Sequence, residues 1–156
     1  MSLYQINHDL PTKLWCGLAA LAALTGHPTS RCLDAIRQVR GYPYDSLGRP
    51  KAVRGVYRHE LVRAFHALGY TRTRTTLLWA AENARPALIK NQPTLAKWLR
   101  ERTPDERAFP CVVVLRGHYI VIKGLLFVDN QHRDPVRASV APYRRSRIEA
   151  IITVRR

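Results

Sequence analysis

The sequence has few cysteines and no long apolar run. Three Cys occur among 156 residues, an odd number, and the first residues, MSLYQINHDLPTK, lack the basic-then-apolar pattern of a secretory signal. We therefore expect no disulfide framework, so each thiol either packs in the core or takes part in a reaction. No apolar segment approaches the ~18 residues of a membrane span, which favours action in a cytoplasm and no membrane partner.

Acidic residues are also scarce. The chain has 26 Lys and Arg against 11 Asp and Glu, a formal net charge of +15. The excess positive charges repel one another, so an acidic protein or a nucleic acid is a reasonable partner. A basic surface that only keeps the protein in solution explains the charge as well. Arginine clusters could form one basic surface: Arg72, Arg74, Arg144, Arg145 and Arg147. Few aromatic residues lie near them, which favours phosphate contact over base stacking.

The first two thirds of the chain predict helices. The segment Cys16–Thr25 is apolar all round, as in a buried helix, and Gly26 is placed to end it. Helices are also expected from about Thr29, from about Arg58 to Gly69, and from Thr94 as the cap to Pro104. Residues 41–55 have the prolines and glycines of a loop, and 70–75 suit a short strand.

After Pro110 the pattern changes to short β-branched strands, expected at 111–116, 118–122, 125–129, 136–141 and 148–154. Helices followed by strands indicate an α+β fold, in which a buried central helix packs on a C-terminal antiparallel sheet. We expect one domain, 1–156, with no internal boundary.

Cys16 is the first candidate for chemistry. It stands where an irregular segment becomes a buried helix, so unpaired amides and the helix dipole favour its anionic form. This setting lowers the pKa of a thiol and raises its reactive fraction. Gly17 would let a substrate approach closely. Because free cysteine is often buried, a purely structural role stays open for Cys16, and it is the simpler interpretation of Cys32 and Cys111.

His118 and Asp129 form the second candidate. The run HYIVIKGLLFVDN contains two apolar strands, and a two-residue loop at Lys123–Gly124 would place His118 directly opposite Asp129 on one face of the sheet. A carboxylate there can orient an imidazole. Asn130 would lie on the other face, and a one-residue slip would exchange the two roles.

Other polar residues have simpler interpretations. His132 and Asp134 suit a solvated turn just past this hairpin. His59 and His66 lack the spacing of a metal-binding pair, and no glycine loop for phosphate is present, so no metal and no cofactor are expected.

Two segments resemble papain-like cysteine peptidases, especially small phage-encoded peptidases and the bacteriocin-processing, double-glycine type. WCGLAALAALTG is similar to their nucleophile helix, and RGHYIVIKGLLFVDN is similar to their His–Asp hairpin, including the interval. GVYRHELVRAFHALGY resembles a further helix of the phage proteins. The resemblance implies a Cys16 nucleophile, a His118 base and an Asp129 orienter, and a location in a host cytoplasm or virion.

The resemblance also leaves choices open. The family often has an oxyanion-hole Gln six residues before the nucleophile, where this chain has Leu10, so Gln5, Asn7 and Thr12 are the candidate donors. The implied activity is hydrolysis of a peptide or isopeptide bond in a protein or peptide substrate. Deamidation or transglutaminase-type transfer would use the same triad. A third alternative is a degenerate scaffold that binds nucleic acid or an acidic host protein.

Overall fold

The computed structural model describes residues 2–41, 44–77 and 92–156. Its centre is a six-stranded antiparallel sheet in the order β1-β6-β2-β3-β4-β5. The strands are β1 (Arg72–Leu77), β2 (Cys111–Leu115), β3 (His118–Lys123), β4 (Leu126–Val128), β5 (Val136–Arg137) and β6 (Ile148–Arg155). The α+β prediction is therefore confirmed, with β1 joining the C-terminal strands through β6.

Within the described ranges, three helices precede β1 and two lie between β1 and β2. They are α1 (Cys16–Thr25), α2 (Thr29–Val39), α3 (Arg58–Ala67), α5 (Leu95–Glu101) and α6 (Pro104–Ala108). Gly26 ends α1 in the left-handed conformation, with φ 72°, and its amide donates to the Ala22 carbonyl. Thr94 caps α5 by accepting from the Lys97 amide. These boundaries follow the predicted ones closely.

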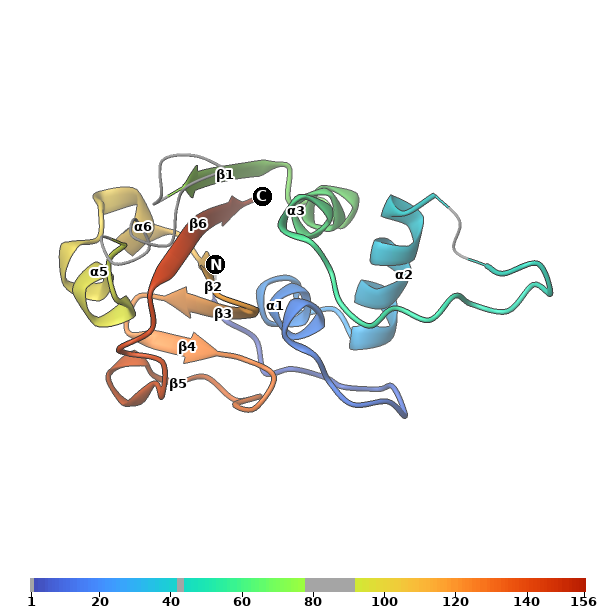
Figure 1. The fold of residues 1–156 in the computed structure, drawn as a ribbon, viewed down its shortest axis with the longest axis horizontal. Helices are drawn as coiled ribbons and strands as arrows, with labels where there is room; N and C mark the ends of the chain where they lie inside the picture. Colours follow the sequence, from blue (N-terminus) through green and yellow to red (C-terminus); the bar gives the residue numbers. More distant parts are fainter. Residues whose placement is uncertain (1, 42–43, 78–91) are drawn as a thin grey trace.

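The sheet separates two apolar cores. One core packs α1, α2 and α3 against one face of the sheet, where Val112, Val121 and Val128 point. The other packs Leu95 and Trp98 of α5 against the face that carries Ile120, Ile122 and Phe127. Figure 1 shows α1 beside β3, with α5 and α6 on the side away from α2 and α3. The start of α1 therefore lies against the middle strands of the sheet.

The β3–β4 hairpin turns one residue later than predicted. Ile122 pairs with Phe127 and Lys123 with Leu126, so the loop is Gly124–Leu125, with Gly124 at φ 58°. This register buries Phe127 opposite Ile122 and leaves Leu125 exposed. His118 and Asp129 are consequently diagonal neighbours rather than directly opposite. They still share a face, because moving the loop by one residue changes the pairing by two.

Two further boundaries differ from the sequence prediction. Helix α5 ends at Glu101, and Pro104 begins α6 instead of ending a helix, with Thr103 and Glu106 forming a capping box. The strand expected at 136–141 is only two residues long and continues as the 3₁₀ helix Ala138–Val140. Across the described ranges, the helices are too short or too polar to cross a membrane.

Candidate active site

Cys16 is the first residue of α1. Trp15 before it is extended, with φ −112° and ψ 159°, and no side chain caps the helix there. The first amides of a helix have no partner within it, so they are oriented toward an anion at this position. A Cβ at Gly17 would collide with the Val56 and Trp15 side chains. The space at Gly17 is thus filled by the protein itself, not left for the substrate as predicted.

His118, the first residue of β3, lines the same two clefts as Cys16. Burial alone would raise the pKa of Cys16, but the hydrogen bond and charge of His118, with the backbone amides of Tyr119 and Gly17, outweigh it and lower this pKa. Burial would likewise lower the pKa of His118, but its hydrogen bonds to Asp129 and Cys16 raise it to about 9. Both shifts favour a thiolate–imidazolium pair near neutral pH.

Asp129, immediately after β4, is 1% exposed. Its Oδ2 lies 3.3 Å from Nε2 of His118, which leaves Nδ1 of that ring for the thiol. Burial would raise the pKa of Asp129, but hydrogen bonds from His118 and His132 outweigh it and hold this pKa well below its usual range. A buried carboxylate that stays ionised beside an imidazole fixes the orientation of the ring and stabilises its protonated form.

His132 and Tyr143 also hold this carboxylate; the sequence interpretation placed His132 in a solvated turn and gave Tyr143 no role at the site. Nδ1 of His132 lies 2.8 Å from Oδ1 of Asp129, and the His132 amide donates to the same oxygen at 2.7 Å. Tyr143 hydrogen-bonds to Asp129, and burial together with this contact raises the pKa of Tyr143 to about 12. Its ring lies 4.9 Å from the His118 ring. The interval of three residues between Asp129 and His132 is typical of an Asp side chain that accepts hydrogen bonds within a turn. This interval is the sequence feature that could have indicated the contact between them.

The other two thiols lie in closed surroundings. Cys32 and Cys111 are both 0% exposed, in agreement with their interpretation as core filler. Burial raises the pKa of each to about 12. Cys16 is the one free cysteine that is partly exposed.

Two clefts meet at Cys16 and His118. The first, which we call the Leu33 cleft, has a volume of about 610 Å³ and includes Leu14, Leu33 and Asn130. The second has a volume of about 350 Å³ and includes Val56, Arg58 and Glu149. A third cleft, of about 530 Å³, contains His118 and Tyr143 but not Cys16. An extended chain could therefore pass the thiol with room on both sides.

The structure separates the predicted oxyanion donors. Gln5 and Asn7 follow Tyr4, whose amide donates to the Ala23 carbonyl near the end of α1. Ala23 is seven residues, or ~10 Å of helix, beyond Cys16, and neither Gln5 nor Asn7 lines a cleft at the thiol. The structure therefore does not bring these two predicted donors to the clefts at Cys16.

Thr12 does line the Leu33 cleft, and so does Asn130, which sequence reasoning considered only as a weaker orienter. Asn130 Nδ2 lies 3.5 Å from the Leu14 carbonyl, while its buried Oδ1 has no partner among the described residues. The Cys16 backbone amide, at the start of the helix, is the other donor available for an oxyanion.

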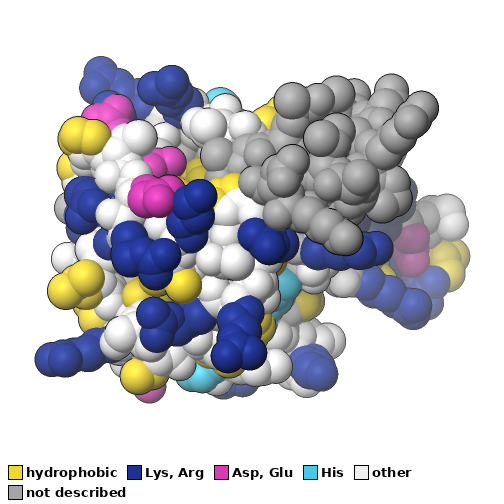
Figure 2. Space-filling model, turned by 60° about the vertical axis from the view of Figure 1, so that its left-hand side comes forward, with side chains coloured by type: hydrophobic (Ala, Val, Ile, Leu, Met, Phe, Trp, Pro, Cys, Tyr) yellow, Lys and Arg dark blue, Asp and Glu magenta, His cyan; other side chains and the backbone are white. Residues whose placement is uncertain are grey.

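The predicted basic surface is divided. Arg72 pairs with Arg155 in the β1–β6 register, whereas Arg147 precedes the other end of β6. Seven residue steps along β6 span ~23 Å, so Arg72 and Arg74 lie far from Arg144, Arg145 and Arg147. In Figure 2, Lys and Arg side chains are spread over the visible face, with few acidic ones among them. On this face the positive charge is distributed and does not form a single patch.

Comparison of this chain with protein-family models, with curated proteins and with solved structures finds no match in any of the three. The site is therefore interpreted from its own geometry: a partly exposed thiol at a helix start, an imidazole beside it, and a buried carboxylate beyond.

Proposed function

We propose that the chain is a papain-like, cysteine-dependent amide-bond hydrolase that cleaves a peptide or isopeptide bond. The observation that supports this proposal is that one imidazole, His118, lines two clefts with the Cys16 thiol and lies 3.3 Å from the buried Asp129 carboxylate. The pKa of the thiol is lowered while the pKa of the imidazole is raised to about 9. Opposed shifts of this kind suit a nucleophile and its general acid–base partner.

In the proposed reaction the Cys16 thiolate attacks the carbonyl carbon of the amide, whose oxygen becomes an oxyanion. The Cys16 amide and a cleft side chain such as Asn130 or Thr12 are placed to bind that oxygen. Protonated His118 then donates its proton to the leaving nitrogen as the C–N bond breaks, which gives an acyl-thioester and a free amine. His118 next takes a proton from water as the water oxygen attacks the thioester; the C–S bond breaks, which releases a carboxylic acid and restores the Cys16 thiolate beside protonated His118.

Asp129 acts in this scheme as a positioning residue. Its Oδ1 is held by His132, and its Oδ2 faces His118. Because Asp129 is anchored by a second imidazole, two backbone amides and Tyr143, its carboxylate can orient His118 without moving itself.

Acyl transfer is the nearest alternative, since an amine could replace water in opening the same thioester. A binding role is supported by the charge of +15 alone. Hydrolysis gives new chain ends, acyl transfer or deamidation changes side-chain masses, and a binding role gives no product. One assay therefore separates these functions.

The test is to incubate the protein with a proteome-derived peptide library and to record new peptide ends and mass changes by mass spectrometry. Hydrolysis predicts new amino termini with the wild type and none with Cys16→Ala. Deamidation would leave every chain intact and change only side-chain masses. If the wild type and Cys16→Ala give the same library, and iodoacetamide labels Cys16 no faster than it labels Cys32, the proposal is wrong.

A further inference from the structure

The Leu33 cleft combines an apolar floor with a cationic rim. Leu14, Leu33 and Val53 contribute apolar side chains beside Cys16 and His118. The charged residues that line this cleft are Lys13, Arg37 and Arg54, all cationic, and no described Asp or Glu lines it. By contrast, the cleft on the other side of the thiol and the third cleft both include Glu149. The bias is therefore local to one side of the thiol.

Arg37 is a fixed part of this wall. Its side chain is only 16% exposed. Its Nε donates to the Lys51 carbonyl at 2.9 Å, and one terminal nitrogen lies 3.3 Å from Asp34. The Asp34 side chain is 66% exposed and lines a small cleft that Arg37 lines too, so solvent screens the Asp34 charge. Arg37 is thus held in place by the Lys51 carbonyl and Asp34, and it lines the Leu33 cleft with its positive charge only weakly compensated.

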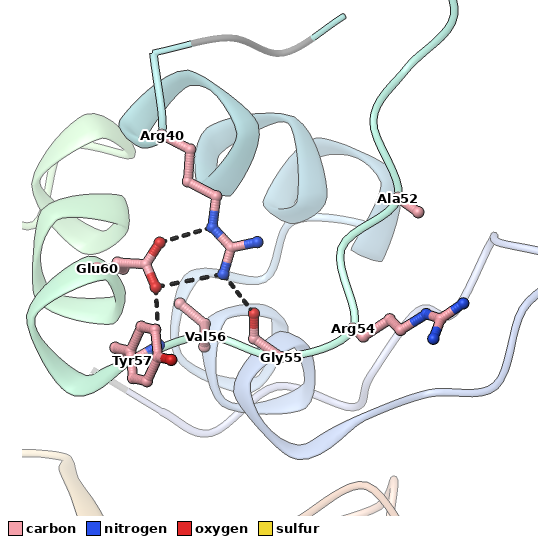
Figure 3. Close-up of a pocket in the computed structure, with 7 residues that line it drawn as sticks. All are labelled: Arg40, Ala52, Arg54, Gly55, Val56, Tyr57 and Glu60. Atoms are coloured by element: carbon pink, nitrogen blue, oxygen red, sulfur yellow. Dashed lines mark hydrogen bonds and ion pairs between the residues drawn. The ribbon is translucent and has the colours of Figure 1, made fainter. Parts of the chain in front are cut away.

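Arg54 lines both clefts at the thiol and makes no hydrogen bond or ion pair with the described residues. Figure 3 shows its guanidinium pointing away from the Arg40–Glu60 ion pair, which is satisfied on the other side of the segment. The segment around Arg54 is itself anchored. Arg40 donates to the Gly55 carbonyl at 2.6 Å, and the Tyr119 hydroxyl donates to the Val56 carbonyl at 2.9 Å.

We propose that the Leu33 cleft binds an acidic side chain of the substrate, so that the enzyme acts on acidic peptides with Asp or Glu beside the bond that it cleaves. This inference rests on the proposed function and adds the substrate class to it. The methylene groups of a Glu side chain suit the apolar floor, and its carboxylate suits the guanidinium groups of Arg37 and Arg54. The third cleft contains His118 without Cys16, which suits the leaving amine. The Leu33 cleft contains Cys16, the residue that the acyl group would join, and the inference assigns the acyl side to it.

The same features favour a peptide over a polynucleotide. A nucleic-acid strand needs a continuous basic track and aromatic faces for its bases. The Leu33 cleft offers one aromatic ring, Trp15, and places its cations around an aliphatic floor. The arginines of the predicted basic surface are divided between the two ends of β6.

The test uses peptidyl vinyl sulfones that differ only in carrying Glu or Gln at the first or second residue before the electrophile. The second-order rate constant for modification of Cys16 is measured by mass spectrometry. For at least one position, the wild type is expected to react about five- to tenfold faster with the Glu probe than with the Gln probe, from one charge-assisted contact. Arg54→Gln should reduce this ratio toward one.

The matched control is Arg63→Gln, which removes the same charge from an exposed position on α3 that lines no cleft at the thiol. It should keep the wild-type ratio. Equal rates for Glu and Gln probes at both positions, or an equal fall in both variants, would overturn the inference. So would protection of Cys16 by a single-stranded DNA oligonucleotide, but not by a Glu-rich peptide, at matched ionic strength.

The two proposals fail differently. A fast reaction of Cys16 with both probes and no preference for Glu would reject the acidic substrate while leaving the thiol enzyme intact. A Glu preference that depends on Arg54, at rates no higher than those of an ordinary thiol, would support an acidic ligand and reject the hydrolase.

Discussion

The start of α1 and the closed cores of the molecule place the same side chain in opposite surroundings. Cys16 is partly exposed, faces His118 and has a lowered pKa, whereas Cys32 and Cys111 are fully buried and have pKa values raised to about 12. Cys16 is also penalised by burial, so exposure alone does not explain the difference. The difference comes from the imidazole and the helix amides that stabilise an anion at one position only.

The largest expected effect is selective alkylation. With iodoacetamide at neutral pH, Cys16 should react at least about a hundredfold faster than Cys32 or Cys111, because only its thiolate is both populated and reachable. Peptide mapping by mass spectrometry gives the three rates. In denaturant the three thiols should react alike, and Cys16→Ser should remove the fast phase. Similar rates for the three thiols in the native protein would show that the start of α1 does not activate Cys16.

The second effect concerns the buried carboxylate. Asp129→Asn should lower the free energy of unfolding by about 2–4 kcal/mol, because it removes a charged acceptor from two imidazoles in a closed site. Chemical denaturation of the wild type and the variant measures this difference. A variant as stable as the wild type would show that the carboxylate is not held by these contacts.

The same pair of proteins predicts a pH dependence. The pKa of Asp129 is depressed in the folded state. Its stabilisation is therefore fully present above the unfolded-state pKa of about 4 and is lost as the pH falls toward the folded-state pKa. The difference in unfolding free energy between the wild type and Asp129→Asn should shrink below about pH 4. A constant difference down to strong acid would contradict the assigned shift.

The smallest effect is expected away from Cys16 and His118, at the network drawn in Figure 3. Glu60 accepts from Arg40 at 2.6 Å and from the Tyr57 amide at 3.0 Å. Glu60→Gln should lower the free energy of unfolding by about 1 kcal/mol, since the Arg40 side chain is 34% exposed and the pair is partly solvated. Thermal denaturation measures this. The alkylation rate of Cys16 should stay at the wild-type value, and a large fall would show that this network reaches the thiol.

The sequence was sufficient where one local pattern decides the structure. The apolar run before Gly26 predicted α1 and the position of Cys16 at its start. The two-residue period of a strand placed His118 and Asp129 on one face even though the loop was placed one residue early, because that error preserves the face.

The sequence was insufficient where distant segments converge. Nothing local brings Tyr143 to Asp129, or Arg37 and Arg54 to the same cleft as Cys16. Pro104 was ambiguous because proline both ends helices and begins them. Gln5 and Asn7 were chosen by proximity in sequence, but their segment returns along the far end of α1.

The pH profile of Cys16 alkylation is the most direct test of the thiolate–imidazolium pair. The rate constant for iodoacetamide is measured across the titration of an ordinary thiol in the wild type and in His118→Ala, with the exposed His66→Ala as the control. The wild type and His66→Ala should keep a high rate well below the ordinary thiol pKa of about 8.5. The profile of His118→Ala should move to higher pH, because burial is then opposed only by the backbone amides of Tyr119 and Gly17. Superimposable profiles for the three proteins would contradict the pairing of Cys16 with His118.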